Sequence, residues 1–449
     1  MPTPNLQDAI DKAGSPIQLL WTPGVAPWAV PVVDPEYVGW REEQAAWRET
    51  VALFDLSYHM SDTVIEGPDS TRLLSEVSAN NLEKFEVGQA KQFVPVASDG
   101  NIITDGILLK ESETRYTLSG VPAAQSWVRY HGETGDYDVA FDTNADSSVR
   151  RDADPSLYRY QIQGPRALDV VSKAFGRVLP ETKFFHSQLV DLDGTSVRAL
   201  RHGMAGQAGY EFIGDYRDHE KVRDALLQAG EEFELARVGG LAYFTNGIES
   251  GWIPTPTPAI YTDPTLADYR TWLSAFSYEG KKPLSGSFYS PNIEDYYTTP
   301  WELGYGRSIS FNHDFIGKDA LRAAKDAPHR VRVTLEFDED DVRRVFGDNP
   351  GHILSYGRYR IEDGEGLAGL TFWTGLIAPL NKVLALSLVE ESVATPGTRV
   401  EVVWGEHPGA GTAPDAELGF ERIRATVQTS PYDEFASTSY RSARDAVAS

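Results

Sequence analysis

The feature that most constrains the fold is a change in the secondary-structure pattern of the sequence near residue 326. From Arg330 onward the chain is a series of short apolar runs: RVRVTLEF, GLAGLTFWTG, KVLALSLV, TRVEVVWG and ERIRATVQ. Short strands with no helices between them are typical of an antiparallel barrel. We therefore expect residues 326–449 to form a separate C-terminal β-barrel domain, because 449 residues exceed one hydrophobic core.

Residues 1–325 instead alternate irregularly between helical and extended patterns, which favours α+β layers over a doubly wound sheet. We expect a helix from Pro35 to about Leu53 and a strand pair over 101–110 that turns at Asp105 and Gly106. Further expected elements are a strand at 64–70, helices at 71–77 and 122–130, and a strand at 160–165.

The composition excludes several classes of function. A formal net charge of −25 argues against nucleic acid or an anionic membrane as a partner. The absence of cysteine excludes disulfides, thiolate nucleophiles and Cys-ligated metals. The most apolar stretch, Gly366–Val389, is interrupted by Pro379 and Lys382, and the N-terminus lacks a signal-peptide pattern. We expect a cytoplasmic protein.

The usual catalytic motifs are absent from the sequence. There is no P-loop, dinucleotide fingerprint, HExxH or GxSxG pattern, and the nine histidines show no spacing typical of metal ligands. We therefore expect no metal site.

Six segments, in order, resemble the aminomethyltransferase (glycine-cleavage T-protein) superfamily. They are LFDLSYHMSDTVIEGPDS (53–70), VGQAKQFVPVASDGNIITDGILL (87–109), YQIQGPRAL (160–168), GQAGYEF (206–212), DFIGKDAL (314–321) and TFWTGLIAPLNKVLALSLV (371–389). The resemblance implies a ring of two interwoven α+β domains, over residues 1–325, and the C-terminal barrel, with folate in a central channel.

Four longer segments are similar to one subgroup, the tetrahydrofolate-dependent aryl ether O-demethylases. They are LSYHM (56–60), RHGMAG (201–206), ESGWIPTPTPAIYT (249–262) and SPNIEDYY (290–297). The subgroup implies one-carbon transfer from an aromatic ether to tetrahydrofolate, with a phenolate as the leaving group. A phenol has a pKa of about 10, so a hydrogen-bond donor on the ether oxygen would help, by roughly 10²–10⁴ in rate.

The resemblance also implies which residues bind the cofactor. Glu211 matches the family glutamate in GYE, whose carboxylate would accept hydrogen bonds from the pteridine amino and ring N–H groups. Gln163 and Met60 match positions near the folate, and Trp252 could stack on its flat rings. The structural alternatives are an exposed strand glutamate for Glu211 and a core tryptophan for Trp252.

Three residues are candidates for catalysis. Tyr243 matches a tyrosine that the subgroup would present to the ether oxygen, and His59 is an alternative donor. Asp105 matches an acidic position of the family, and it is either catalytic or a turn residue before Gly106. A core aromatic and a buried histidine are the corresponding structural alternatives for Tyr243 and His59.

Three departures from the subgroup concern the substrate. Gly120 stands where the demethylases of aromatic acids have an arginine, Leu56 replaces a polar amide, and Trp28 replaces a tyrosine. A buried carboxylate without its arginine would be costly, so these changes predict a neutral aromatic ether. The methylenedioxy bridge of a lignan such as sesamin would give a catechol and 5,10-methylene-tetrahydrofolate, and a methoxy group would give 5-methyl-tetrahydrofolate.

Two other functions stay open from the sequence. The first is demethylation of vanillate- or syringate-type acids, with Arg115 or Arg129 replacing the lost arginine. The second is folate binding without transfer, as in iron–sulfur assembly members of the superfamily, but those relatives carry a Cys motif that this chain lacks. We expect no lipoyl carrier protein as a partner, because the specific segments match the demethylases.

Overall fold

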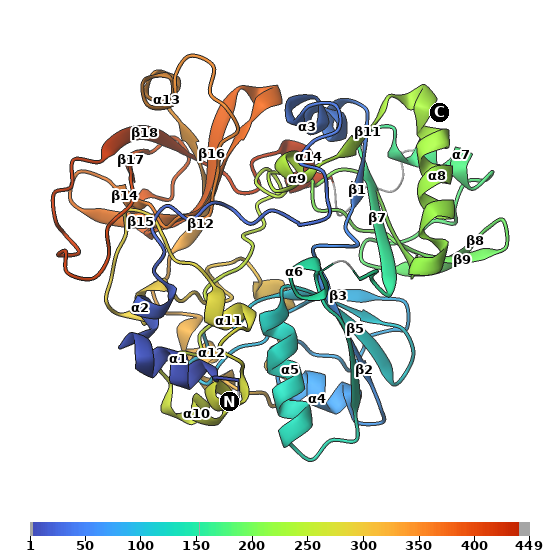
Figure 1. Cartoon of the computed structure of the whole chain (residues 1–449), viewed down its shortest axis with the longest axis horizontal. Coiled ribbons are helices and arrows are strands. Elements are labelled where there is room, and N and C mark those ends of the chain that lie inside the picture. Colours follow the sequence, from blue (N-terminus) through green and yellow to red (C-terminus); the bar gives the residue numbers. More distant parts are fainter. Residues whose placement is uncertain (1–2, 152, 440–449) are drawn as a thin grey trace.

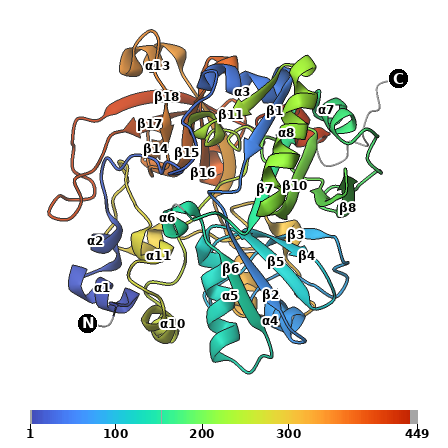
Figure 2. The same ribbon diagram turned by 45° about the vertical axis from the view of Figure 1, so that its right-hand side comes forward.

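Three β-sheets with their helices surround the centre of the molecule in the computed structural model, which describes residues 3–151 and 153–439 (Figure 1). A view turned by 45° shows the same three parts, with the barrel strands apart from the two other sheets (Figure 2). The segment that contains α9, α10 and α11 begins after β11, the edge strand of the six-stranded sheet. It runs past the barrel to the N-terminal helix α1 (Figure 1).

The first sheet has six strands in the order β11-β1-β7-β10-β9-β8. Their bounds are β1 Val51–Asp55, β7 Leu157–Gln163, β8 Ser187–Leu192, β9 Thr195–Leu200, β10 Gly209–Asp215 and β11 Leu235–Val238. Only the pairing of β1 with β11 is parallel. Helices α7 (Ala167–Ala174) and α8 (His219–Gly230) pack on it through one apolar core.

The second sheet has five antiparallel strands in the order β3-β4-β5-β2-β6. Their bounds are β2 Ser61–Glu66, β3 Ala90–Phe93, β4 Gly106–Lys110, β5 Arg115–Gly120 and β6 Ala140–Asn144. Helices α4 (Ser70–Glu76) and α5 (Pro122–Thr134) share its core. Pro122 occupies the first turn of α5, where its missing N–H costs no helical hydrogen bond.

The third sheet closes on itself as a barrel, because β15 pairs with β16 as well as with β14. Its strands are β12 Val331–Phe337, β13 Leu354–Ser355, β14 Arg360–Glu362, β15 Leu367–Ile377, β16 Lys382–Val389, β17 Arg399–Trp404 and β18 Glu421–Gln428. Helix α13 (Glu339–Phe346) interrupts this series after β12. The α+β class with a C-terminal barrel is confirmed, while the exact boundary at residue 326 stays a prediction.

The other helices are short and connect or cover the sheets. They are α1 Leu6–Ala13, α2 Pro16–Leu20, α3 Trp40–Glu49, α6 Ser147–Arg150, α9 Gly240–Tyr243, α10 Ala267–Trp272, α11 Tyr278–Lys281, α12 Lys318–Ala324 and α14 Glu434–Thr438. No helix in the described part of the chain combines the length and the apolar character that a membrane crossing requires.

Two expectations about local structure were wrong. The helix expected up to Leu53 ends at Glu49, and Val51–Asp55 is β1, because these apolar residues are buried between β7 and β11. The turn expected at Asp105 is absent, because Gly106 begins β4 and pairs with both β3 and β5. In both cases the pairing of distant strands overrides the local pattern.

The chain crosses between the first two sheets twice. Residues 56–60 lead from β1 of the six-stranded sheet to β2 of the five-stranded sheet, and residues 145–156 lead back from β6 to β7. The LSYHM segment therefore lies where the two sheets meet. This crossing positions the candidate site.

Candidate active site

The turn after β1 brings His59 against Tyr243, the last residue of α9. The Tyr243 hydroxyl and His59 Nε2 form a hydrogen bond, and the ring centroids are 4.5 Å apart. Both side chains are half-buried, so part of each surface stays accessible. The sequence-predicted donor and its alternative are thus one hydrogen-bonded pair.

The electrostatics of this pair separate the two roles. Burial lowers the pKa of His59 to about 3, and the nearby positive charge of Arg159 adds to the shift. Burial also raises the pKa of Tyr243 well above its ordinary value. At neutral pH the imidazole is therefore neutral and the phenol keeps its proton, which makes Tyr243 the better hydrogen-bond donor.

Glu211, on β10, is buried in an ion pair with Arg159 of the neighbouring strand β7. Gln161 Nε2 also donates to Glu211 Oε2 at 3.1 Å. Arg159 Nη2 continues to Asp62 Oδ1 at 2.7 Å and to Ser119 Oγ at 2.9 Å. Because Asp62 and Ser119 lie on β2 and β5, this network joins the two sheets.

Sequence reasoning missed Arg159, although a signal exists. In LYRYQIQ the polar residues 159, 161 and 163 alternate with apolar residues, so they share one face of β7. Burial lowers the pKa of Arg159, but Asp62 and Glu211 more than offset this effect and the net shift is upward. The guanidinium is therefore a permanent positive charge in the interior.

Gln163 holds the loop that carries the RHGMAG segment. Its Oε1 accepts from the backbone N–H of Ala205 at 3.1 Å and of Gln207 at 3.4 Å. A Cβ added at Gly203 would overlap the Gln163 amide, so the loop needs glycine at this point.

The loop places Met204 Sδ 3.9 Å from the Tyr243 hydroxyl. Gln163 thus positions this loop, and a direct folate contact stays a prediction, as it does for the half-buried Met60.

Asp105 and Trp252 form a second group. Asp105 Oδ2 accepts from Trp252 Nε1 and from the Tyr305 hydroxyl, both at 2.9 Å, and from Gln92. Burial raises the pKa of Asp105. The three donors orient the carboxylate, and the carboxylate in turn orients the half-buried Trp252 ring. These contacts show a structural role, and a catalytic one stays a prediction.

The two groups are neighbours in the five-stranded sheet. Gly120 pairs with Gly106 across β5 and β4, and it follows Ser119, which binds Arg159. Asp105 directly precedes Gly106. Aromatic rings also lie between the groups. Tyr356 is within electrostatic range of Tyr243 and stacks on Trp373 at 5.8 Å, and Trp373 meets Trp252 edge-on at 6.3 Å.

The three residues predicted to shape the substrate pocket lie around this region. Gly120 has φ +147°, a conformation that side chains rarely adopt, so its lack of a side chain is a demand of the backbone. Leu56 is buried, and its N–H donates to the Arg159 carbonyl at 2.8 Å. Trp28 is 42% exposed and meets Phe244 edge-on at 6.0 Å, beside Tyr243.

Neither alternative arginine lies free for a substrate. Arg115 is paired with Glu66 and Glu111, and Arg129 is paired with Glu133 on the surface of α5. In residues 3–151 and 153–439, no three His, Asp or Glu side chains are grouped so that they could hold a metal ion.

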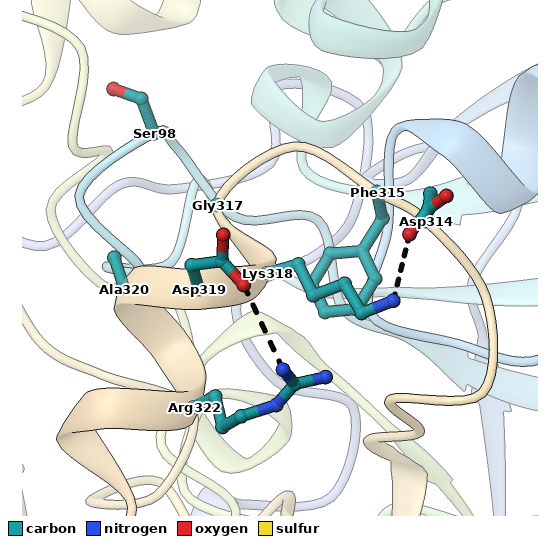
Figure 3. A pocket seen from close by; sticks show the side chains of 8 residues that line it. All are labelled: Ser98, Asp314, Phe315, Gly317, Lys318, Asp319, Ala320 and Arg322. Carbon is teal, nitrogen blue, oxygen red and sulfur yellow. Dashed lines mark hydrogen bonds and ion pairs between the residues drawn. The ribbon is translucent and has the colours of Figure 1, made fainter.

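A surface pocket of about 410 Å³ lies elsewhere, at α12 and the DFIGKDAL segment (Figure 3). Its charged side chains pair with each other, as Lys318 does with Asp314 at 2.8 Å and Arg322 with Asp319 at 3.8 Å. A Cβ on Gly317 would lie 2.1 Å from the Ala97 carbonyl oxygen. The segment therefore docks closely on the connection between β3 and β4, and we assign it a structural role.

The family model of the GCVT N-terminal domain matches residues 24–256, slightly more than half of the chain. The chain belongs to the GCVT family. It is 38% identical to the syringate O-demethylase of Sphingobium sp. strain SYK-6, over 97% of either chain. It is 29% identical to the sesamin methylene transferase of Sinomonas sp. strain No.22, over 88% of this chain and 89% of the relative.

The fold of this GCVT family member is also that of a solved relative. The aminomethyltransferase T of the glycine cleavage system from Bartonella henselae superposes with a TM-score of 0.60 at 20% identity, covering 94% of this chain and 96% of that one. All three names describe transfer or removal of a one-carbon group. Family and relatives together identify an enzyme of the transferase class.

Proposed function

We propose that this enzyme cleaves an aryl ether C–O bond and passes the one-carbon unit to tetrahydrofolate. The observation that carries the proposal is the Tyr243–His59 pair beside the buried Glu211–Arg159 network. A protonated phenol at neutral pH suits a departing aryl oxygen. The similarity to a syringate O-demethylase and a sesamin methylene transferase supports the same chemistry.

The residues present fit tetrahydrofolate. Glu211 Oε2 accepts a hydrogen bond from Gln161, and a carboxylate oxygen can accept more than one, so it suits the N–H groups of a pteridine. Arg159 pairs with this carboxylate and holds it in place. Trp252, oriented by Asp105, offers a half-buried flat surface. When bound, the cofactor would supply the nitrogen that accepts the carbon.

The chain's own part in the reaction is to hold the donor at the ether oxygen. The Tyr243 hydroxyl donates a hydrogen bond that strengthens as negative charge develops on the leaving oxygen. The neutral His59 cannot serve as a strong acid at pH 7. In its Nε2–H tautomer it donates to the Tyr243 oxygen, which leaves the single Tyr243 proton for the ether oxygen. Half-burial of both side chains limits competing water.

The preferred substrate in this proposal is a neutral aromatic ether with a methylenedioxy or methoxy group. Gly120, Leu56 and Trp28 support this choice because none of them carries a positive charge that could pair with a carboxylate. Arg115 and Arg129 support it as well, because both are already paired with glutamates.

The second candidate substrate is an aromatic acid of the syringate type. One observation favours it: the chain is 38% identical to the syringate O-demethylase and 29% identical to the sesamin methylene transferase. With this substrate the folate product would be the 5-methyl form.

We propose the cytoplasm as the place of action and small molecules as the only partners, since the net charge of −25 disfavours nucleic acid and anionic membranes.

The test is mass spectrometry of the folate after incubation with sesamin or syringate. A 5,10-methylene or 5-methyl product that forms with the aromatic ether and is lost in Tyr243→Phe is the expected result. Folate that binds but stays unchanged with every ether would instead favour a non-catalytic folate-binding protein. Tetrahydrofolate that does not bind at all would overturn the proposal.

A further inference from the structure

Two buried basic side chains, Lys282 and Arg358, lie close enough in the interior for their charges to interact. Lys282 follows α11 and is 7% exposed, and Arg358 lies between β13 and β14 and is 3% exposed. The two segments are held together, since the Arg358 N–H donates to the Ser285 carbonyl at 2.8 Å. The Arg358 backbone occupies the space that a Cβ on Gly286 would need, so the two segments are packed in direct contact.

Neither cation has a salt bridge to a carboxylate within the described residues. Lys282 Nζ donates to the Thr255 carbonyl at 2.7 Å, which uses one of its three donors. Arg358 Nη1 donates to the Tyr356 carbonyl at 2.9 Å and to the Phe372 carbonyl at 3.4 Å, and its guanidinium carbon lies 4.0 Å from the Phe372 ring centroid. Its Nε is buried without a hydrogen-bond partner. Buried charges are normally paired, because an isolated one is expensive.

Burial disfavours the positive charge of both side chains. Burial lowers the pKa of Lys282 well below its ordinary value, and the charge of Arg358 adds to the effect. Burial likewise lowers the pKa of Arg358 to about 10. A bound carboxylate would reverse both effects and would satisfy the free guanidinium donors.

The pair adjoins the candidate active site. Thr255, which binds Lys282, is three residues after Trp252, and Tyr356, which binds Arg358, stacks on Trp373. Burial raises the pKa of Tyr278, and Glu279, Arg358 and Asp105 all lie within electrostatic range of its hydroxyl. Lys282 Nζ lies 5.9 Å from the Tyr278 ring centroid.

We propose that Lys282 and Arg358 form a binding site for a ligand carboxylate. The inference rests on the proposed function for the identity of the ligand. The carboxylate can come from two sources, an aromatic acid substrate or the glutamate tail of tetrahydrofolate. If the ligand is an aromatic acid, Lys282 and Arg358 bind the carboxylate that the arginine replaced by Gly120 would bind. If it is the folate tail, the aromatic substrate itself is neutral.

A purely structural role makes a different prediction. Thr255 has φ +50°, and Lys282 could serve only to hold this unusual backbone conformation. Loss of Lys282 would then disturb all ligands equally, whether or not they carry a carboxylate. The comparison of matched ligands therefore separates the two roles.

The test is calorimetry on Lys282→Met, with Lys281→Met, the exposed neighbour, as control. The ligand pairs are tetrahydrofolate against a tetrahydropterin without the glutamate, and syringate against its methyl ester. We expect Kd to rise about ten-fold or more for a carboxylate-bearing ligand and to stay within about two-fold for its uncharged partner. The pair that responds identifies the source. Equal losses within both pairs, or no loss, would overturn the inference.

A second measurement is independent of the proposed function. Benzoate at millimolar concentration should raise the Tm of the unmodified protein more than benzamide does. This difference should disappear in Lys282→Met and in Arg358→Gln and persist in Lys281→Met. A difference that persists in the first two folded variants, or is absent from the unmodified protein, counts against a carboxylate site, even if the enzyme turns out to transfer no one-carbon unit.

Discussion

The Tyr243 hydroxyl shares a hydrogen bond with His59 Nε2, where the turn between two sheets meets a helix 184 residues further along the chain. The low pKa of His59 and the raised pKa of Tyr243 leave the proton on the phenol at neutral pH. This contact supports the proposal that Tyr243 is the donor and His59 is the residue that positions it.

Tyr243→Phe should lower kcat by roughly 10²–10⁴ while folate affinity stays near normal, because the hydroxyl acts on the leaving oxygen. Single-turnover kinetics and calorimetry measure the two effects. Tyr58→Phe is the control, since Tyr58 lies in the same turn but binds the Tyr216 hydroxyl at 2.7 Å. Full activity of Tyr243→Phe would transfer the donor role to His59 or to water.

Glu211→Gln should weaken tetrahydrofolate binding by about 1.5–3 kcal/mol for each charge-assisted hydrogen bond lost. Glutamine is preferable to alanine, because removing one member of the buried Arg159 pair costs about 3–5 kcal/mol of stability. Asp62→Asn is the matched control, since it removes the other carboxylate partner of Arg159. If both variants lose the same folate affinity in calorimetry, Glu211 acts only through the ion network.

His59 should make the protein less stable in acid. Its pKa is about 3 when folded and about 6.5 when unfolded, so the unfolded state binds more protons between these values. Stability from this group is complete above pH 6.5 and is lost as the pH falls towards 3. Between pH 7 and pH 5 the loss is at most about 2 kcal/mol, because solvent screens a half-buried group.

The measurement for His59 is urea unfolding at both pH values. His59→Gln should show a smaller pH-dependent loss of unfolding free energy than the unmodified protein. His219→Gln is a control, because His219 is the first residue of α8 and stacks on Tyr216. The same pH dependence in His59→Gln and the unmodified protein would mean that His59 is not buried neutral in the folded state.

A substitution at Gly120 tests whether its backbone conformation requires glycine. Gly120→Ala should destabilise the protein by about 1–3 kcal/mol, because φ +147° is unfavourable for any side chain. Gly351→Ala should be nearly neutral, since Gly351 has no positive φ and nothing within 4 Å of its Cβ position. For the same reason we expect Gly120→Arg to lose stability before it restores acid binding. Equal stability of the two alanine variants in urea would contradict this account.

Much of the architecture was determined by local sequence. The apolar runs after Arg330 became barrel strands because alternating or continuous apolar residues suit a closed sheet in nearly any context. Pro122 and the apolar periodicity after it were sufficient for α5. Family motifs also named Tyr243, Glu211 and Asp105, although they could not say what these residues touch.

Tertiary structure decided the rest. Residues 51–53 are predicted from the sequence to end a helix, but they pair with β7 and β11 as part of a strand. Asp105 is predicted to be either catalytic or a turn residue, and in the structure Trp252 and Tyr305 bind its carboxylate. Arg159 joins Glu211 and Asp62 across 52 and 97 residues of chain. Lys282 and Arg358 look like ordinary surface cations in the sequence. Pairing and burial of this kind depend on which distant segments fold against each other, and no local pattern records that.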